Sequence, residues 1–254
     1  MSDIAFPPGT PCWVDLFTSD PARAHAFYGE VLGWDREESG PEYGGYVTYS
    51  LGGAPVGGAM HNDGSQGVPD VWSVYLATPD IGATLARGTE HGGTVLYGPM
   101  DVPRLGHSGM LADVGGAAVG CWQADPFPGL GALGRPGAPG WFELRTREYE
   151  ASIAFYRDVF AWDPHTSMDT PELRYTTLGQ GQDMRAGIYD GAGRLPDGVP
   201  SHWAVYFMVE DVDAAVATAG RLGGSVLQPA ADTPWGRLAG LADPTGATFS
   251  LMSS

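Results

Sequence analysis

Two aromatic–acid pairs stand at equivalent places in the sequence. Trp13 and Asp15 are two residues apart, and so are Trp141 and Glu143. Because side chains two apart on a strand share a face, each tryptophan would line the same surface as its carboxylate. An aromatic wall beside a carboxylate suits a flat or cationic organic ligand, through stacking and cation–π contact. Such a carboxylate could also serve as a general base.

The two pairs belong to a duplication of the whole chain. Phe27 recurs as Phe155, an offset of 155 − 27 = 128 residues. Three longer landmarks recur in the same order: Ala26-Phe27-Tyr28 as Ala154-Phe155-Tyr156, Trp72-x-x-Tyr75 as Trp203-x-x-Tyr206, and Leu111-Ala112-Asp113 as Leu241-Ala242-Asp243. Tandem copies usually pack together, and a ligand site then lies between or inside them.

The elements that must position these residues repeat as well. Residues 11–18 predict a strand, and Asp20 followed by Pro21 predicts the start of a helix that ends at Gly33. The rest of the first copy predicts a hairpin over 46–51 and 54–61, strand 70–77, a helix from Pro79-Asp80 to Gly92, and strands 94–97 and 109–122. The second copy predicts strand 140–146, helix 148–161, hairpin 173–189, strand 201–209, helix 211–222, and strands near 225–228 and 237–252.

Each half therefore contains the βαβββ pattern twice, which indicates an α+β fold of tandem modules. We expect a first module over residues 1–125, a linker rich in glycine and proline over 126–139, and a second module over 140–254. We also expect Trp34, Trp72, Trp162 and Trp203 to be core residues.

Charge and composition exclude several functions. All 13 basic residues are arginine, so neither a lysine Schiff base nor a P-loop lysine exists. A net charge of −17 disfavours nucleic acid and anionic membranes as partners. Residues 1–8 resemble no secretion signal and no apolar run is long enough to span a bilayer, so we expect a cytoplasmic protein in which Cys12 and Cys121 are reduced and buried. The G-x-G-x-x-G at 129–134 lacks the strand and helix of a dinucleotide site.

The order of these elements resembles the vicinal oxygen chelate superfamily. The resemblance rests on Phe27-Tyr28 in the first helix, its equivalent in the second copy, and Asp243-Pro244-Thr245-Gly246 before the last strand. It covers about residues 10–123 and 139–253, and the superfamily includes glyoxalase I, bleomycin- and fosfomycin-resistance proteins and extradiol dioxygenases. The two Trp-x-acid pairs look most like its two-module actinobacterial branch, some members of which occur near antibiotic pathways.

The resemblance implies a metal centre, but the matching positions depart from the pattern. The positions of the metal ligands hold Trp13 and Trp141, Ser73 and Ala204, Gly120 and Ser250, and, near the end of each hairpin, Met60 or His61 and Tyr189 or Asp190. A divalent metal needs three or four converging nitrogen or oxygen donors. We therefore expect no metal and no other cofactor. An alternative is a metal-dependent lyase or dioxygenase that uses Glu143, His202 or His61.

The resemblance also implies that each copy forms a cup-shaped sheet. Tyr75 would then join the first aromatic–acid pair in one cup, and Tyr206 would join the second pair in the other. In an enzyme, Asp15 or Glu143 would be the general base, and Tyr75 or Tyr206 would donate a proton or a hydrogen bond. Further ligand-binding candidates are His61, His202, and His107 and Trp235, which we place on matching loops.

A competing interpretation pairs the two carboxylates with arginines such as Arg104, Arg145 or Arg237. We expect a protein that binds or transforms a small aromatic or polyketide-like molecule without a metal, as a lyase, isomerase or hydroxylase-like enzyme. A non-catalytic, drug-sequestering protein is a second alternative. The predicted assembly is a monomer of two packed modules or a homodimer.

Overall fold

The computed structural model describes residues 4–181 and 184–253 of the 254-residue chain. The first half contains β1 (Pro11–Thr18), α1 (Pro21–Leu32), β2 (Asp35–Glu38), β3 (Val47–Leu51), β4 (Ala54–His61), β5 (Val71–Ala77), α2 (Ile81–Glu90), β6 (Thr94–Val102), β7 (Gly106–Ala112) and β8 (Ala118–Ala124). The second half contains β9 (Pro139–Thr146), α3 (Tyr149–Phe160), β10 (Pro164–Asp169), β11 (Arg174–Leu178), β12 (Ala186–Asp190), β13 (His202–Val209), α4 (Val212–Arg221), β14 (Ser225–Thr233), β15 (Gly236–Ala242) and β16 (Thr248–Ser253).

Each half forms one eight-stranded sheet from two βαβββ units. The orders are β2-β3-β4-β1-β5-β8-β7-β6 and β10-β11-β12-β9-β13-β16-β15-β14. The α+β fold class is confirmed, but the sheets are mixed rather than antiparallel throughout. The first and last strands of each unit pair in parallel, because the helix between them returns the chain to the same direction.

The predicted boundaries of α1 are confirmed. The Asp20 side chain accepts a hydrogen bond from the Arg23 amide at 3.1 Å, Pro21 opens the helix, and Gly33 ends it with φ = 73°. Two strands, β2 and β10, were not predicted. All four residues of β2 are exposed and three of them are acidic, so this edge strand has no apolar alternation from which to predict it.

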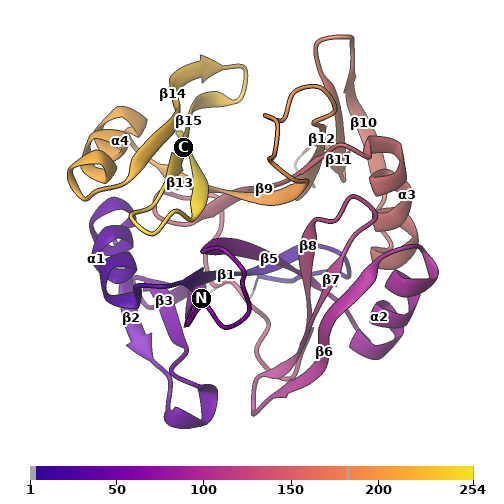
Figure 1. Ribbon diagram of the computed structural model, residues 1–254, viewed down its shortest axis with the longest axis horizontal. Coiled ribbons are helices and arrows are strands. Elements are labelled where there is room, and N and C mark those ends of the chain that lie inside the picture. Colours follow the sequence, from indigo (N-terminus) through magenta and orange to yellow (C-terminus); the bar gives the residue numbers. More distant parts are fainter. Residues whose placement is uncertain (1–3, 182–183, 254) are drawn as a thin grey trace.

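The two sheets lie back to back, and their outer strands curve away from each other (Figure 1). Helix α1 lies beside α4 at one side, and α2 lies beside α3 at the other (Figure 1). The concave faces therefore open in opposite directions, and we call them the first cup (β1–β8) and the second cup (β9–β16). The predicted core tryptophans Trp34, Trp72, Trp162 and Trp203 are all buried, which confirms that prediction.

A buried hydrogen-bond chain joins the first module to the second. The Tyr28 hydroxyl on α1 donates to Asp243 Oδ2 at 3.1 Å and accepts from Trp72 Nε1 at 2.8 Å. The other oxygen of Asp243 accepts from the backbone amides of Thr245 and Ala247, in the turn before β16. The landmark residues of the repeat thus hold the modules together.

An equivalent hydrogen-bond chain joins the second module to the first through the pseudo-equivalent residues. Tyr156 on α3 donates to Asp113 Oδ2 at 3.0 Å and accepts from Trp203 Nε1 at 2.8 Å. Asp113 also accepts from the amides of Gly115 and Ala117. Each module therefore supplies the carboxylate that satisfies a tyrosine of the other.

The segment between β8 and β9 packs against the first sheet. The amide of Leu130 donates to the carbonyl of Cys12, and the amide of Gly131 donates to that of Pro55. A Cβ at Gly129, where φ is +125°, would lie 2.1 Å from the Cys12 carbonyl oxygen, so the close approach requires glycine. The G-x-G-x-x-G residues thus have a packing role.

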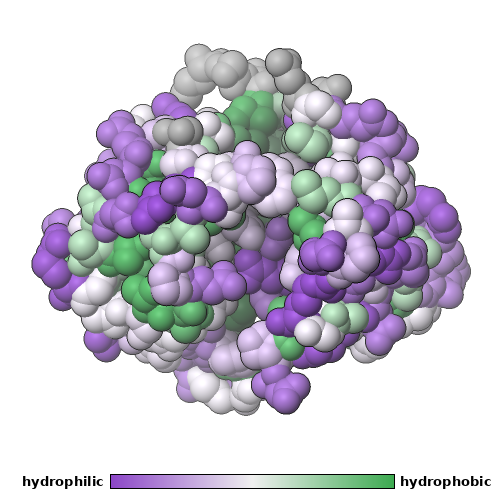
Figure 2. Space-filling model, turned by 90° about the horizontal axis from the view of Figure 1, so that it is seen from above, coloured by the Kyte–Doolittle hydropathy of each residue, from purple (hydrophilic) through white to green (hydrophobic). Residues whose placement is uncertain are grey.

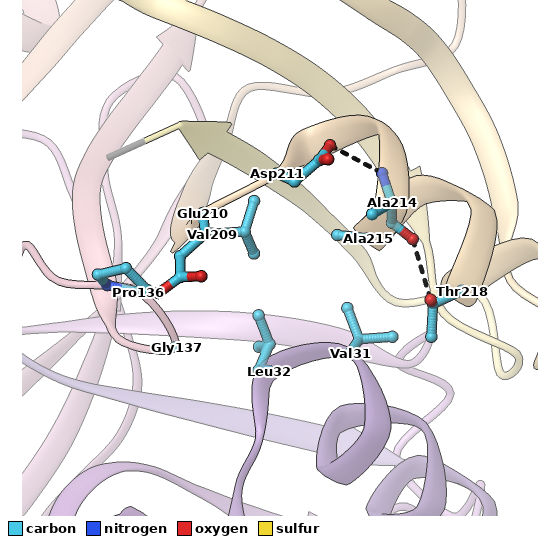
Figure 3. A pocket seen from close by; sticks show the side chains of 10 residues that line it. All are labelled: Val31, Leu32, Pro136, Gly137, Val209, Glu210, Asp211, Ala214, Ala215 and Thr218. Atoms are coloured by element: carbon cyan, nitrogen blue, oxygen red, sulfur yellow. Dashed lines mark hydrogen bonds between the residues drawn. The ribbon is translucent and has the colours of Figure 1, made fainter.

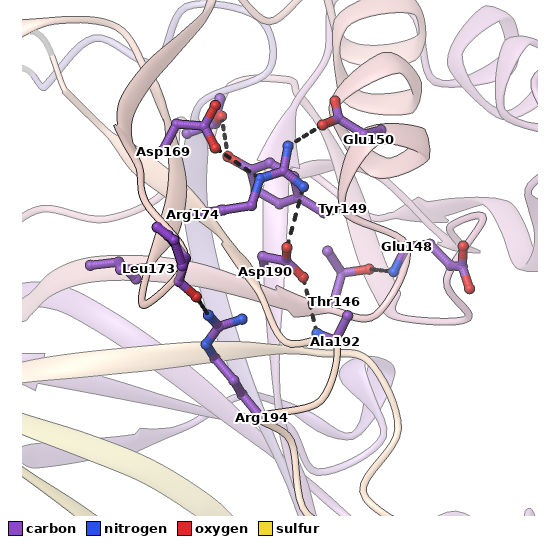
Figure 4. A network of polar contacts seen from close by, with 12 residues as sticks. Thr146, Glu148, Tyr149, Glu150, Asp169, Leu173, Arg174, Asp190, Ala192 and Arg194 are labelled. Atoms are coloured by element: carbon purple, nitrogen blue, oxygen red, sulfur yellow. Dashed lines mark hydrogen bonds and ion pairs between the residues drawn. The ribbon is translucent and has the colours of Figure 1, made fainter.

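An arginine-centred network ties the outer edge of the second sheet to α3 (Figure 4). Arg174 pairs with Asp169 at 3.0 Å, with Asp190 at 3.4 Å and with Glu150, and its guanidinium lies 4.5 Å from the Tyr149 ring centroid. Because these acids surround Arg174, the network has a structural role at the sheet edge.

The remaining expectations concern the thiols and membrane insertion. Cys12 and Cys121 are free and buried, as predicted. Burial raises the pKa of Cys121 to about 12, which leaves this thiol inert. Among the described residues, no helix has both the length and the apolar character needed to cross a membrane.

Candidate functional site

The first cup brings Trp13, Asp15 and Tyr75 together. Strand register places Trp13 directly opposite Tyr75, and Asp15 opposite Ser73 on one side and Gly58 on the other. Trp13 Nε1 donates to Asp15 Oδ1 at 2.8 Å, so the tryptophan orients the carboxyl that follows it by two residues. The face-sharing predicted from the spacing is therefore present.

A residue that the sequence analysis missed completes this contact. The hydroxyl of Tyr46, just before β3, donates to Asp15 Oδ1 and lies 2.7 Å from Trp13 Nε1. A Cβ at Gly58 would lie 1.8 Å from the Tyr46 oxygen and 2.8 Å from Asp15 Oδ1. The glycine on β4 thus leaves the space in which the tyrosine reaches the acid.

The environment of Asp15 favours its protonated form. Burial raises the pKa of this carboxyl, while hydrogen bonds from Tyr46 and Trp13 act in the opposite direction. Asp15 forms no ion pair with any described residue, so the predicted arginine partner is wrong for this acid. Arg104 pairs instead with Glu42, and Arg237 pairs with Asp213 and Asp232.

A row of hydroxyl groups continues from the acid across the floor of the first cup. Tyr75 and Tyr97 have their hydroxyl oxygens 3.2 Å apart, and Tyr97 lies 2.9 Å from Ser108 Oγ. Burial raises the pKa of Tyr75 well above its usual range, with the Asp15 charge as the next cause. Tyr75 is therefore a hydrogen-bond donor or proton donor rather than a phenolate.

The rest of the first cup is aromatic and sulfur-rich. The Phe127 ring packs edge-on against Trp13, with centroids 5.1 Å apart, and the Phe127 carbonyl accepts from Trp122 Nε1. Register places Met60 and Met100 on the same concave face, with 47% and 50% of their surface exposed. Methionine is flexible and polarisable, so such a wall adapts to flat aromatic ligands.

The second cup repeats the frame with a different charge pattern. Glu143 Oε2 accepts from Tyr175 at 2.9 Å, and Trp141 Nε1 donates to the same tyrosine at 2.8 Å. Glu143 Oε1 accepts from Tyr206 and from Arg145 Nε, both at 2.8 Å. The predicted arginine pairing is thus confirmed for Glu143. Seen from above, this face of the molecule is hollowed near its centre, where hydrophilic residues gather (Figure 2).

His202 lies in the second cup. It stands opposite Arg145 in the register of β13 and β9, on the face of Glu143. Its Nδ1 lies 2.9 Å from the Pro200 carbonyl, and because a carbonyl only accepts, this nitrogen carries the hydrogen. Burial lowers the pKa of His202, so the ring is neutral near pH 7.

None of the other three ligand-binding candidates forms a hydrogen bond or ion pair with Asp15 or Glu143. His61 is exposed, and alternation along β4 puts it on the opposite face from Gly58. His107 lies on β7 rather than on a loop, faces away from the cup in register, and pairs with exposed Asp101 at 2.6 Å. Trp235 lies in the tight turn between β14 and β15 with 54% of its surface exposed. Only His202 of the four joins a predicted carboxylate.

The residues at the expected metal positions do not fit a metal. Trp13, Ser73 and Gly120 offer no set of three strong donors, and the Trp13 indole already donates to Asp15. In the part of the chain that the structure describes, no three His, Cys, Asp or Glu side chains converge to hold an ion. The positions expected for metal ligands thus lack the donors that a divalent metal needs.

A separate cavity of about 340 Å³ lies between α1 and α4 (Figure 3). Leu32 and Thr218 line it, together with Pro136 and Gly137. By the internal repeat, the corresponding residues at the α2–α3 side are the larger Phe160 and Arg87. Arg87 Nε lies 3.4 Å from the Val159 carbonyl there. This cavity thus reflects smaller side chains on one side of the pseudo-symmetric interface.

Comparison with known proteins identifies the family. The profile described as "Glyoxalase/Bleomycin resistance protein/Dioxygenase superfamily" matches residues 12–120 and 138–251. The chain belongs to this superfamily. Its two matched segments coincide with the two sheets, which confirms the resemblance inferred from the repeated motifs.

Relatives that match over nearly their whole length include one named for anthracycline biosynthesis. The chain is 38% identical over 268 residues to the "Anthracycline biosynthesis protein DauV" of Streptomyces sp. (strain C5), covering 97% of this chain and 94% of that protein. It is 37% identical over 251 residues to CFP32 of Mycobacterium tuberculosis (strain CDC 1551 / Oshkosh), provisionally named a glyoxylase, covering 96% and 94%.

A solved structure with the same fold is the 2,3-dioxygenase LapB from Pseudomonas sp. KL28. Its TM-score is 0.68 at 11% sequence identity, with 99% of this chain and 94% of LapB covered. At this identity the comparison concerns the fold alone. The chain thus shares the arrangement of a dioxygenase while its cups carry aromatic, hydroxyl and carboxyl groups.

Proposed function

We propose that the first cup binds a flat, neutral, hydroxylated aromatic molecule and that Asp15 moves a proton to or from it without a metal. The observation that carries the proposal is the carboxyl of Asp15, which is held by Trp13 and Tyr46 and has no cationic partner among the residues that the structure describes. Such a group is a stronger base than an ordinary aspartate when ionised, and a proton donor when neutral.

The surrounding side chains support an aromatic ligand. Trp13, Phe127 and the exposed methionines offer apolar surface for fused rings, and the hydroxyls of Tyr75 and Tyr97 suit a row of ring oxygens. The relative named for anthracycline biosynthesis also supports this ligand class, because anthracyclines are fused-ring aromatic compounds. Of the two carboxylates, Asp15 is the better candidate for proton transfer, since Glu143 is paired with Arg145.

Hydrogen–deuterium exchange at a weakly acidic C–H bond tests the proposal. Anthrone is a suitable probe, because its C10 methylene loses a proton to give an aromatic enolate, and the deuteron from solvent replaces it. We expect the protein in D₂O to accelerate loss of the C10 proton signal over buffer. The rate should rise with pH through the raised pKa of Asp15, because the base is the ionised form.

The variant Asp15→Asn should retain anthrone binding, measured by tryptophan quenching, and lose the acceleration. Asp63→Asn, which changes an exposed acid in the same module, is the matched control and should exchange like the wild type. Equal exchange by Asp15→Asn and wild type would remove Asp15 as the base. Tight binding with no acceleration by the wild type would instead indicate a protein that sequesters its ligand.

A further inference from the structure

The second cup differs from the first at one position beside the carboxylate. Arg145 follows Glu143 by two residues on β9, and by the offset of 128 its counterpart on β1 is Phe17. Phe17 extends the apolar wall of the first cup, whereas Arg145 brings a permanent positive charge into the second. The two cups therefore present different chemistry on the same frame.

Glu143 is fully engaged in holding this arginine. One oxygen accepts from Arg145 Nε and from Tyr206, and the other accepts from Tyr175. Only 12% of the Glu143 side chain is exposed. Because both oxygens of Glu143 are already engaged by donors, its role here is to orient the guanidinium.

The guanidinium keeps donors that no described residue uses. Arg145 Nε donates to Glu143 and Nη2 donates to Tyr206 at 2.8 Å, but Nη1 has no hydrogen-bond partner in residues 4–181 and 184–253. The side chain is 23% exposed, and register places it between Tyr189 and His202 on the concave face. Its remaining N–H groups are thus available to a molecule inside the cup.

The surroundings of Tyr189, beside Arg145, include a second cation, Arg194, and a second acid, Asp190. Burial raises the pKa of Tyr189; the guanidiniums of Arg194 and Arg145 lower it, and the carboxylates of Glu143 and Asp190 raise it. The neighbouring His202 is neutral near pH 7. Glu143 is the acid in contact with Arg145, and its oxygens are taken by donors.

From this geometry we infer that the second cup is a binding site for an aromatic oxyanion, a carboxylate or an ionised phenol. The anionic oxygen accepts from Nη1 of Arg145, and the ring lies against the partly exposed Trp141 and against Tyr206. A planar guanidinium presents parallel donors that match a carboxylate or a phenolate with a neighbouring oxygen. The site is independent of proton transfer by Asp15, and it makes the two cups selective for neutral and anionic aromatic ligands.

A matched pair of ligands tests the inference. 2-Naphthoate is anionic at pH 8, and 2-naphthamide has the same ring and nearly the same shape without the charge. In calorimetric titrations of the full-length protein we expect naphthoate to bind at least about tenfold more tightly, the scale of a charge-assisted hydrogen bond. Salicylate and phenol, titrated across the phenol pKa, distinguish carboxylates from phenolates as the oxyanion.

Two variants locate the site. The double variant Arg145→Met with Glu143→Gln removes both charges of the ion pair and so avoids an unpaired buried carboxylate. It should abolish the preference for naphthoate and leave naphthamide affinity within about twofold. Arg157→Met with Asp158→Asn removes an ion pair on the outer surface of α3, and this matched control should keep the preference.

Three results would overturn the inference. Equal affinities of the wild type for the acid and the amide would show that no oxyanion site exists. A preference that survives in the folded Arg145→Met, Glu143→Gln variant, or one that is lost in the Arg157→Met, Asp158→Asn control, would place the site elsewhere. A failed anthrone experiment would concern the first cup alone and would leave this inference intact. Asp15→Asn should bind naphthoate as the wild type does.

Discussion

Tyr28 and Tyr156 should act as hydrogen-bonded locks between the modules, and removing either hydroxyl should destabilise the whole chain. In Tyr28→Phe the ring remains in its aromatic packing, while the bond to Asp243 Oδ2 and the acceptor of Trp72 Nε1 are both lost. Tyr156→Phe makes the equivalent change against Asp113. These substitutions therefore isolate the hydrogen bonds from the apolar contacts.

The expected cost follows from the two lost partners. A hydrogen bond to a charged group contributes about 1.5–3 kcal/mol, and a buried donor left without an acceptor costs about 1–3 kcal/mol. Because both losses come from one hydroxyl and the site can relax, we expect each variant to lose about 2–4 kcal/mol of unfolding free energy. For a chain of this length, a loss of about 3 kcal/mol lowers the Tm by roughly 6–12 °C.

Urea and thermal unfolding, followed by circular dichroism and tryptophan fluorescence, measure this effect. Tyr189→Phe is the matched control, because no described residue hydrogen-bonds to its hydroxyl, and it should change stability by no more than about 0.5 kcal/mol. If Tyr28→Phe and Tyr156→Phe were both as stable as Tyr189→Phe, the two hydrogen-bond chains between the modules would not stabilise the protein as proposed. If fluorescence and circular dichroism gave separate transitions, the modules would be unfolding independently.

Two further predictions concern Asp15 and the cavity between α1 and α4. Folding raises the pKa of Asp15, so the native state binds this proton more tightly than the unfolded chain, whose aspartates titrate near about 3.9. The unfolding free energy of the wild type should therefore fall as the pH rises from that value through the higher pKa of the folded state. Asp15→Asn should lack this fall and be the more stable protein at pH 7. A wild-type stability that rose relative to the variant across pH 3–8 would contradict the environment assigned to this acid. Thr218→Arg copies Arg87 of the other interface, and its unfolding free energy in urea should increase by about 0.5–1 kcal/mol from one new hydrogen bond. Ala217→Arg puts the same charge on an exposed neighbour and is the control. If Thr218→Arg were no more stable than Ala217→Arg, the cavity would not accept the side chain.

The sequence carries the local and periodic features of this fold well. The limits of α1 follow from Asp20, Pro21 and Gly33, because capping and termination are decided by neighbouring residues. The duplication predicts the pseudo-symmetric pairing of the cups, and residue spacing alone places each tryptophan beside its acid. Edge strands are different: β2 is exposed on both faces and owes its conformation to pairing with β3, a contact that no periodic pattern reports.

The tyrosines that donate to the two acids were missed for a physical reason. Tyr46 reaches Asp15 from 31 residues away, and Tyr175 reaches Glu143 from 32, through strand pairings that bring distant segments together. A signal does exist, since each tyrosine precedes by 12 residues the glycine whose missing side chain makes room for it: 58 − 46 = 12 and 187 − 175 = 12. The repeat marks this pair of positions, but only the geometry shows what it is for.

The hydrogen-bond chains between the modules explain why the two cups could differ in chemistry while keeping the same backbone frame. In each hydrogen-bond chain the tyrosine and tryptophan come from one module and the aspartate from the other, so loss of the tyrosine hydroxyl or of the carboxylate leaves a buried polar group unsatisfied in the core. Residues 17 and 145 lie outside these hydrogen-bond chains, because their side chains face the open cups. A single change there turns an apolar wall into a guanidinium and leaves the packing between the sheets untouched. The differences between the cups should therefore be sought on the concave faces, and the similarities in the shared core.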